Sequence, residues 1–159
     1  MAFLFSLCLL FPQHYPEMSS HQRDVVCKYE HLIRVEAKKN NIEPELLASL
    51  IFVESAFLPD AQSSVGACGL TQVVPKWTGG KETKGVSYTC QQLKRPETSI
   101  RVGAEILSYN IRVYAKGSID KGLCVYNAGT KCITRKGFYK RLQYVKKVNY
   151  IFNLLTGGC

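Results

Sequence analysis

A single carboxylate, Glu54, follows an apolar run in the stretch LLASLIFVESAFLPD. Leu47, Leu50 and Glu54 share one helical face, because residues three, four and seven positions apart lie one above another. A carboxyl group at the edge of a core has a raised pKa, since burial disfavours its charged form. Such a group still holds a proton near neutral pH, which a general acid needs in order to cleave a glycosidic bond. The alternative is a structural glutamate bound to an arginine or a backbone amide.

A polar, glycine-containing segment follows this glutamate. Gly66 and Gly69 allow sharp turns and a close approach of the backbone to a ligand. Hydroxyl and amide side chains in and after this segment can bind sugar hydroxyls and N-acetyl groups. The candidate binding residues are Ser63, Gln72, Tyr126 and Asn127, the last two within the stretch VYNAGT.

The elements that must position these residues are predominantly helical. Apolar residues recur at helical spacing, and no run of strands is convincing. Pro44 and Pro96 suit the first turn of a helix, and Asp24 and Ser118 can cap one. The expected helices span about 24–39, 44–58, 66–74, 96–117, 118–129 and 138–155, with a long loop over 76–95. The sequence therefore predicts a mostly α fold of five to seven helices around one core.

The N-terminus divides the chain into two expected parts. Residues 2–11 are apolar, which is too short for a membrane span but fits the core of a signal peptide. We expect a leader or extension over 1–22 and a catalytic domain over 23–159. The alternative is an apolar N-terminal helix or strand that packs on the domain. Of the seven cysteines, six remain without Cys8, and their pairing is left open. No cysteine or histidine pattern indicates a metal, and no cofactor is expected.

Charge is distributed unevenly along the chain. The formal net charge is +9, and all 12 acidic residues lie at or before Asp120. A basic C-terminal third indicates an anionic partner, such as nucleic acid or an anionic cell wall. The alternative is a solvated face that keeps the protein soluble.

Several stretches, in order, resemble one known family. The segment ESAFLPDAQSSVGACGLTQVVP is similar to the signature of the soluble lytic transglycosylases, whose SLT domain has a goose-type lysozyme-like fold. PETSIRVGAEIL, VYNAGT and YVKKVNYI resemble that family's later motifs, so that the likeness covers roughly residues 25–152. The resemblance implies a single SLT domain with Glu54 as the catalytic acid.

The resemblance also implies a reaction. The family cleaves the β-1,4 bond between N-acetylmuramic acid and N-acetylglucosamine in peptidoglycan and forms a 1,6-anhydro ring without water. On this basis Glu54 acts first as acid and then as base, and Tyr126 orients Glu54 or the N-acetyl group. Ser63, Gln72 and Asn127 hold the glycan.

The chain departs from the family pattern at five positions. Thr71 replaces a usual methionine, which puts one substrate contact in doubt, and Ser99 replaces a usual asparagine, which puts a local hydrogen bond in doubt. Arg95 replaces a common aspartate, so a helix loses its expected cap. Cys68 and Cys124 occupy positions that are usually small.

Two other functions remain open from the sequence. One is a hydrolytic lysozyme on the same fold, and the other is a non-catalytic wall-binding part of a phage particle or secretion machine. The expected partner is the glycan strand of peptidoglycan, with a secretion, conjugation or phage assembly as the setting. We expect no nucleic-acid partner, a monomer, and a location that is exported, periplasmic, wall-associated or within a phage particle.

Overall fold

The computed structural model describes residues 6–157, with Gly137 and Tyr139 described only by their backbone. Its α-helices are α1 (Leu7–His14), α2 (Ser20–Lys39), α3 (Pro44–Ser55), α4 (Cys90–Leu93), α5 (Pro96–Tyr109), α6 (Ile119–Ala128) and α7 (Arg135–Thr156). Short 3₁₀ turns lie at Pro75–Trp77, Lys81–Thr83 and Thr130–Ile133, and α5 continues into a π-helical turn at Asn110–Tyr114. The expectation of a mostly α fold with five to seven helices is confirmed.

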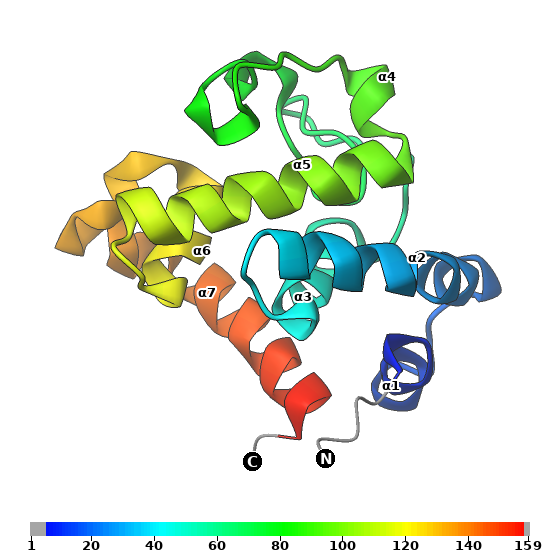
Figure 1. The fold of residues 1–159 in the computed structure, drawn as a ribbon. Coiled ribbons are helices and arrows are strands. Elements are labelled where there is room, and N and C mark those ends of the chain that lie inside the picture. The colour runs from blue at the N-terminus through cyan, green and yellow to red at the C-terminus, as the bar shows by residue number, and fades with distance from the viewer. Residues whose placement is uncertain (1–5, 158–159) are drawn as a thin grey trace.

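Helix α3 lies at the centre of the core. Its residues Leu46, Leu47, Leu50 and Ile51 are all buried, and Pro44 occupies its first turn. Figure 1 shows α5 crossing the middle of the molecule, with α4 and its neighbouring loops on one side and α2 and α3 on the other. Helix α7 packs along α3, which brings the C-terminal part of the chain against the segment that carries Glu54.

The expected start of the helix over 24–39 is wrong. Helix α2 begins at Ser20, and its cap is Ser19, whose side chain accepts a hydrogen bond from the Gln22 amide while Gln22 bonds back to Ser19. Asp24 is an exposed residue inside this helix. Helix α5, by contrast, starts at Pro96 with no side-chain cap from Arg95, as expected.

The expected helix over 66–74 is also wrong. This segment folds into tight turns joined by isolated antiparallel bridges, Gln62 to Cys68 and Cys68 to Val73. Gly69 has a φ of +80°, and a Cβ placed on it would lie 1.9 Å from the Leu93 carbonyl oxygen. Because positive φ is incompatible with a right-handed helix, the apolar spacing here has no helical meaning.

The N-terminal segment packs on the domain. Leu7 and Phe11 are fully buried, and Cys8 is joined to Cys27 of α2. The Glu30 carboxylate accepts hydrogen bonds from the backbone amides of Leu7 and Cys8, which satisfies the N-terminal end of α1. These contacts correspond to the alternative of an N-terminal helix that packs on the domain. The division of the chain into residues 1–22 and 23–159 stays a prediction. Residues 2–5 of the apolar run lie outside the described residues.

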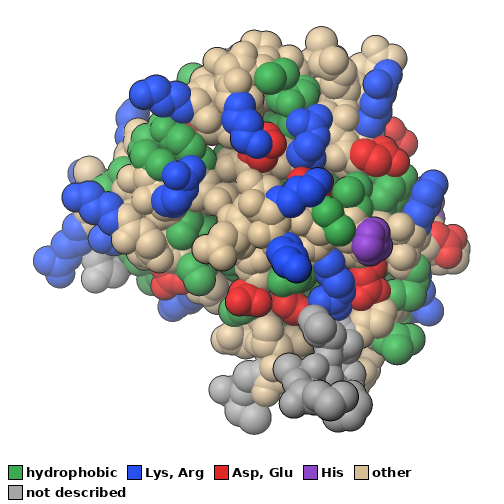
Figure 2. All heavy atoms as spheres, in the orientation of Figure 1, with side chains coloured by type: hydrophobic (Ala, Val, Ile, Leu, Met, Phe, Trp, Pro, Cys, Tyr) green, Lys and Arg blue, Asp and Glu red, His purple; other side chains and the backbone are tan. Residues whose placement is uncertain are grey.

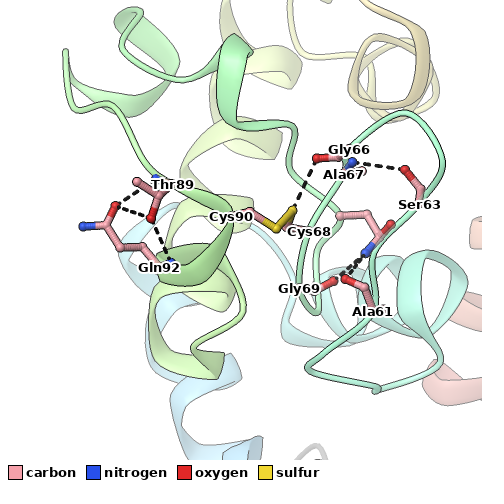
Figure 3. Close-up of a disulfide and its surroundings, with 10 residues drawn as sticks. Ala61, Ser63, Gly66, Ala67, Cys68, Gly69, Thr89, Cys90 and Gln92 are labelled. Atoms are coloured by element: carbon pink, nitrogen blue, oxygen red, sulfur yellow. Dashed lines mark hydrogen bonds between the residues drawn. A yellow bond between two sulfur atoms is a disulfide. The ribbon is translucent and has the colours of Figure 1, made fainter.

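The segment over 76–95 is more ordered than the expected loop, since it contains α4 with a capping box between Thr89 and Gln92 (Figure 3). Three disulfides, Cys8–Cys27, Cys68–Cys90 and Cys124–Cys132, join neighbouring elements. Cys159 lies outside the described residues. None of the helices within residues 6–157 combines the length and apolar character needed to cross a lipid bilayer.

Candidate active site

An open cleft of about 460 Å³ lies beside the C-terminal end of α3. Three of the residues that the sequence singles out, Glu54, Ser63 and Gln72, line it together with Lys147 of α7. The remaining lining residues are Phe52, Val53, Ser55, Ala56, Ala61 and Gln62. Among these described residues Glu54 is the sole acid, and the exposed Asp60 is not part of the lining.

The end of α3 fixes the position of Glu54. The helix stops at Ser55, and the next two residues, Ala56 and Phe57, are left-handed with φ of 50° and 60°. The Ser55 hydroxyl donates to the Leu70 carbonyl at 2.8 Å, which ties the helix end to the turn segment that carries Gln72. Glu54 therefore lies in the last turn of a buried helix and opens into the cleft.

The surroundings of Glu54 raise its pKa from 4.5 to about 7. Burial is the largest cause, because it disfavours the carboxylate. Two groups on α7 oppose it: the Tyr144 hydroxyl donates a hydrogen bond to Glu54 Oε1 at 2.5 Å, and the Lys147 ammonium attracts the negative charge. The group is therefore a carboxyl that exchanges its proton near neutral pH, which suits both donation and removal of a proton.

Ser63 and Gln72 come from the turn segment, residues 61–74, which forms one wall of the cleft. Figure 3 shows Ser63 in this segment, near Ala67 and Gly69. The Gln72 amide nitrogen donates to the carbonyls of Ala61 and Gly69, which closes the turn and leaves the side-chain carbonyl without a donor among the described residues. The Ser63 hydroxyl accepts from the Ala67 amide and keeps its own proton for a ligand. Both side chains thus combine a structural bond with a group free for binding.

Tyr126 and Asn127 lie in the last turn of α6, outside the residues that line the cleft. The Tyr126 hydroxyl donates to the Thr71 carbonyl at 2.8 Å, and burial together with the Glu54 charge raises its pKa. Tyr126 therefore holds the turn segment in place through Thr71. The tyrosine hydroxyl that bonds to Glu54 is that of Tyr144. Asn127 is exposed, and its expected role in binding stays a prediction.

Two of the departures from the family pattern contact each other. The Thr71 hydroxyl donates to the Ser99 carbonyl at 2.8 Å, and the Thr71 amide donates to the Ser99 hydroxyl at 3.1 Å. Both residues are fully buried, and Thr71 lies against Gly103. Ser99 thus forms hydrogen bonds with Thr71, whose side chain packs away from the solvent.

The motifs in the sequence do not single out Tyr144, and Lys147 stands out there only as one of the basic residues of the C-terminal third. Both lie in YVKKVNYI, which was interpreted only as the closing helix. They are three positions apart and share a face of α7 next to the buried Val145 and Val148. A tyrosine and a lysine beside the apolar stripe of a helix are a weak sign of a site near that helix. The sequence does not show that Tyr144 contacts Glu54, because Glu54 lies 90 residues earlier in the chain.

Comparison with known sequences gives a consistent result. Residues 31–149 match the family described as the transglycosylase SLT domain. The chain is 27% identical over 156 residues to membrane-bound lytic murein transglycosylase C of Glaesserella parasuis, with 89% of this chain and 43% of that protein covered. It is 30% identical over 133 residues to the protein of the same name from Actinobacillus pleuropneumoniae, with 77% and 36% covered. The chain thus spans less than half the length of these curated relatives.

Solved structures are similar over most of the chain. An inactive mutant of the lytic transglycosylase Slt from Pseudomonas aeruginosa superimposes with a TM-score of 0.61 at 26% identity, covering 92% of this chain and 24% of that one. The 70 kDa soluble lytic transglycosylase from Escherichia coli superimposes with a TM-score of 0.60 at 23% identity, covering 86% and 26%. The second likeness shows the lysozyme-like fold alone.

Proposed function

The chain belongs to the transglycosylase SLT domain family, and from that premise we propose that it is a peptidoglycan lytic transglycosylase. The observation that carries the proposal is Glu54, an acid with a pKa of about 7 at the wall of an open cleft. Its protonated form can donate to the bridging oxygen of a glycosidic bond at neutral pH, since a poor leaving oxygen needs a proton as the bond breaks.

The proposed bond is the β-1,4 link between N-acetylmuramic acid and N-acetylglucosamine. Glu54 protonates the bridging oxygen, and the acetamido oxygen of the substrate stabilises the cationic sugar that forms. The Glu54 carboxylate then removes the proton from the C6 hydroxyl, whose oxygen bonds to C1 and closes a 1,6-anhydro ring. The Glu54 carboxyl loses its proton in the first step and regains one in the second, so the enzyme returns to its starting state.

The composition of the cleft wall favours this route over hydrolysis. A hydrolytic glycosidase of the common type uses two carboxylates, one of them to activate water or to bond to the sugar. The described lining of this cleft offers Glu54 alone, whereas the proposed reaction uses one group as acid and base in turn. Tyr144 and Lys147 favour the first step, because both stabilise the carboxylate that is left when Glu54 gives up its proton.

Two further parts of the function are proposals. Ser63 and Gln72 bind the glycan through the hydroxyl proton and side-chain carbonyl that the fold leaves free. The protein acts outside the reducing cytosol, at the cell wall or within a phage particle, because three disulfides persist best in an oxidising environment. A secretion, conjugation or phage assembly as partner and the monomeric state stay predictions.

Analysis of the products tests the proposal. Purified protein is incubated with murein sacculi, and the soluble fragments are examined by mass spectrometry. We expect fragments ending in 1,6-anhydro sugars, and none from the Glu54→Gln variant, since loss of a general acid costs about 10²–10⁴-fold in rate. Reducing ends would instead identify a hydrolytic lysozyme, and sacculi that bind the protein without being cleaved would identify a non-catalytic wall-binding component.

A further inference from the structure

Helix α7 carries much of the positive charge of the C-terminal third. It contains lysines and arginines but no acidic residue, and no acid follows Asp120 anywhere in the sequence. In Figure 2, Lys and Arg side chains gather at the left edge of the molecule, where Figure 1 places the segment leading into α7. The basic residues of the helix point in different directions, so only some of them can contact a ligand that lies in the cleft.

Three of these lysines form one row. Lys136, Lys140 and Lys147 are spaced by four and seven residues, so at about 100° per residue they lie within about 40° of one another around the helix. All three are exposed. The row, which we name the α7 lysine row, extends about 16 Å along the helix axis at about 1.5 Å per residue.

Two further exposed basic residues of α7 point elsewhere. Arg141 and Lys146 lie about 100° or more around the helix from Lys147. They carry the same charge as the row lysines and are also exposed. They are therefore matched controls for any property that depends on where the charge lies rather than on how much charge there is.

The α7 lysine row leads into the cleft. Lys147 lines the cleft with Glu54, and its charge acts on the Glu54 carboxyl. Tyr144, which bonds to Glu54, lies one turn before Lys147 on the same side of the helix. A single molecule that occupies the cleft can therefore also place an anion along the row.

Among the described residues no salt bridge involves the α7 lysine row, although the charge of Lys147 acts on Glu54. The salt bridges of residues 6–157 involve Arg34, Lys39 and Lys84, and none of the three row lysines. Asp120, the last acid of the chain, accepts a hydrogen bond from Asn149, on the far side of α7 from Lys147. Exposed ammonium groups in such a row attract an anionic ligand and are screened by salt.

We propose that the α7 lysine row binds carboxylates on the peptide substituents of the glycan strand that is cleaved at Glu54. The inference rests on the proposed function and adds a specificity to it: strands that carry anionic peptides bind better than strands whose carboxylates are neutral. Lysine suits this task, because a flexible stem with a point charge can follow carboxylates on a mobile peptide. Lys136 and Lys140 are binding residues away from the reacting bond, and Lys147 links the row to it.

The test compares two charge-matched double variants, Lys136→Gln/Lys140→Gln and Arg141→Gln/Lys146→Gln. The substrates are soluble peptidoglycan fragments that keep their peptides, and the same fragments after their carboxylates are coupled to methylamine. On the untreated fragments we expect the first variant to raise KM roughly two- to thirty-fold with kcat unchanged, since two exposed ion pairs are lost. The second variant should retain the wild-type KM, and both should match wild type on the neutralised fragments.

Three outcomes would overturn the inference: equal effects of the two variants, an effect that persists on the neutralised fragments, or no change in KM. Binding to intact sacculi, measured by sedimentation with the Glu54→Gln substitution added to each protein, gives a readout that needs no turnover. Weaker binding of the row variant alone supports the inference even where the product analysis contradicts a transglycosylase. Equal binding of the two variants rejects it even where wild type cleaves the strand.

Discussion

The Tyr144 hydroxyl donates to Glu54 Oε1 at 2.5 Å, across 90 residues of sequence, and joins the end of α3 to the middle of α7. The bond does two things to the candidate acid. It fixes the direction of the carboxyl group at the cleft, and it stabilises the charged form, which opposes the effect of burial on the pKa. Proton donation and proton removal therefore depend on a residue that lies outside the recognised motif of the turn segment.

Replacing Tyr144 by phenylalanine should change both the rate and its pH dependence. The pKa of Glu54 rises above its present value of about 7, because a hydrogen bond to the carboxylate is lost. Since the general acid must be protonated at the start, the alkaline limb of kcat/KM moves to higher pH. We expect kcat to fall about tenfold, as one charge-assisted hydrogen bond contributes about 1.5 kcal/mol.

The matched control is Tyr150→Phe, which changes an exposed tyrosine of the same helix. Its pH profile should coincide with that of the wild-type protein. A Tyr144→Phe profile with the wild-type alkaline limb, measured on soluble fragments between pH 5 and 9, would mean that Tyr144 has no effect on the proton of Glu54.

The raised pKa of Glu54 also predicts how stability depends on pH. The folded protein holds this proton up to a pKa of about 7, whereas the unfolded chain releases it near 4.5. The folded state binds more protons between these values, so the free energy of unfolding falls as pH rises through this window. The contribution of Glu54 is at most about 3 kcal/mol, since one pKa unit corresponds to about 1.4 kcal/mol.

The Glu54→Gln variant lacks this titration and should gain stability relative to wild type as pH rises. Urea unfolding at pH 5 and pH 8 measures the difference. We expect the variant to be favoured at pH 8 by up to about 3 kcal/mol more than at pH 5. Parallel stability curves for the two proteins would show that the folded environment does not disfavour the carboxylate.

Local signals in the sequence predicted the frame of the site. Pro44, Pro96 and Ser118 mark the starts of α3, α5 and α6, because their backbone or side-chain chemistry suits the first turn. Helical spacing in α3 then places Glu54 beside buried leucines. These predictions succeed because each depends on residues within one or two turns of one another.

Contacts between distant segments could not be predicted in this way. Thr71 and Ser99 were separate departures from a pattern, and only the fold shows that they bond to each other. The turns at 66–74 looked helical, because apolar spacing carries no information on the positive φ of Gln72 or on the close approach of Gly69 to Leu93. The sequence likewise leaves the pairing of the cysteines open, and the structure pairs Cys27 with Cys8, which a cleaved leader would remove.

Removing the disulfide between Cys68 and Cys90 should raise KM as well as lower the free energy of unfolding. The bond closes a separation of 22 residues, for which the chain-entropy model gives about 3 kcal/mol. Cys68 takes part in both bridges of the turn segment that carries Ser63 and Gln72 (Figure 3). The Cys68→Ala/Cys90→Ala variant should therefore have a raised KM at temperatures where it is still folded.

Removing the bond between Cys124 and Cys132 provides the comparison. It closes a separation of only 8 residues and costs about 2.5 kcal/mol in the same model. Thermal unfolding ranks the two stabilities, and KM on soluble fragments reports on the cleft. Equal KM values for the two double variants would contradict a special role of Cys68–Cys90 in holding the turn segment.

Phe11 of α1 is expected to be a major contributor to the stability of the domain. It is fully buried, and its ring centroid lies 4.9 Å from that of Phe57 and 5.3 Å from that of Phe52, the two aromatic residues that flank the Glu54 turn. Phe11→Ala should cost about 3–5 kcal/mol in the free energy of unfolding, since a large buried ring leaves a cavity. Leu9→Ala on the same helix, where the side chain is 70% exposed, should change it by about 0.5 kcal/mol or less.

Urea unfolding of the two variants, measured on the chain with its N-terminal residues in place, decides between the two interpretations of this segment. A large loss for Phe11→Ala with none for Leu9→Ala means that residues 7–14 belong to the folded core beside the cleft. If both variants unfold like wild type, α1 contributes nothing to the core, and the interpretation of residues 1–22 as a removable leader gains its support. The Cys8→Ser/Cys27→Ser variant gives a second check, because removal of this disulfide should lower stability only in the first case.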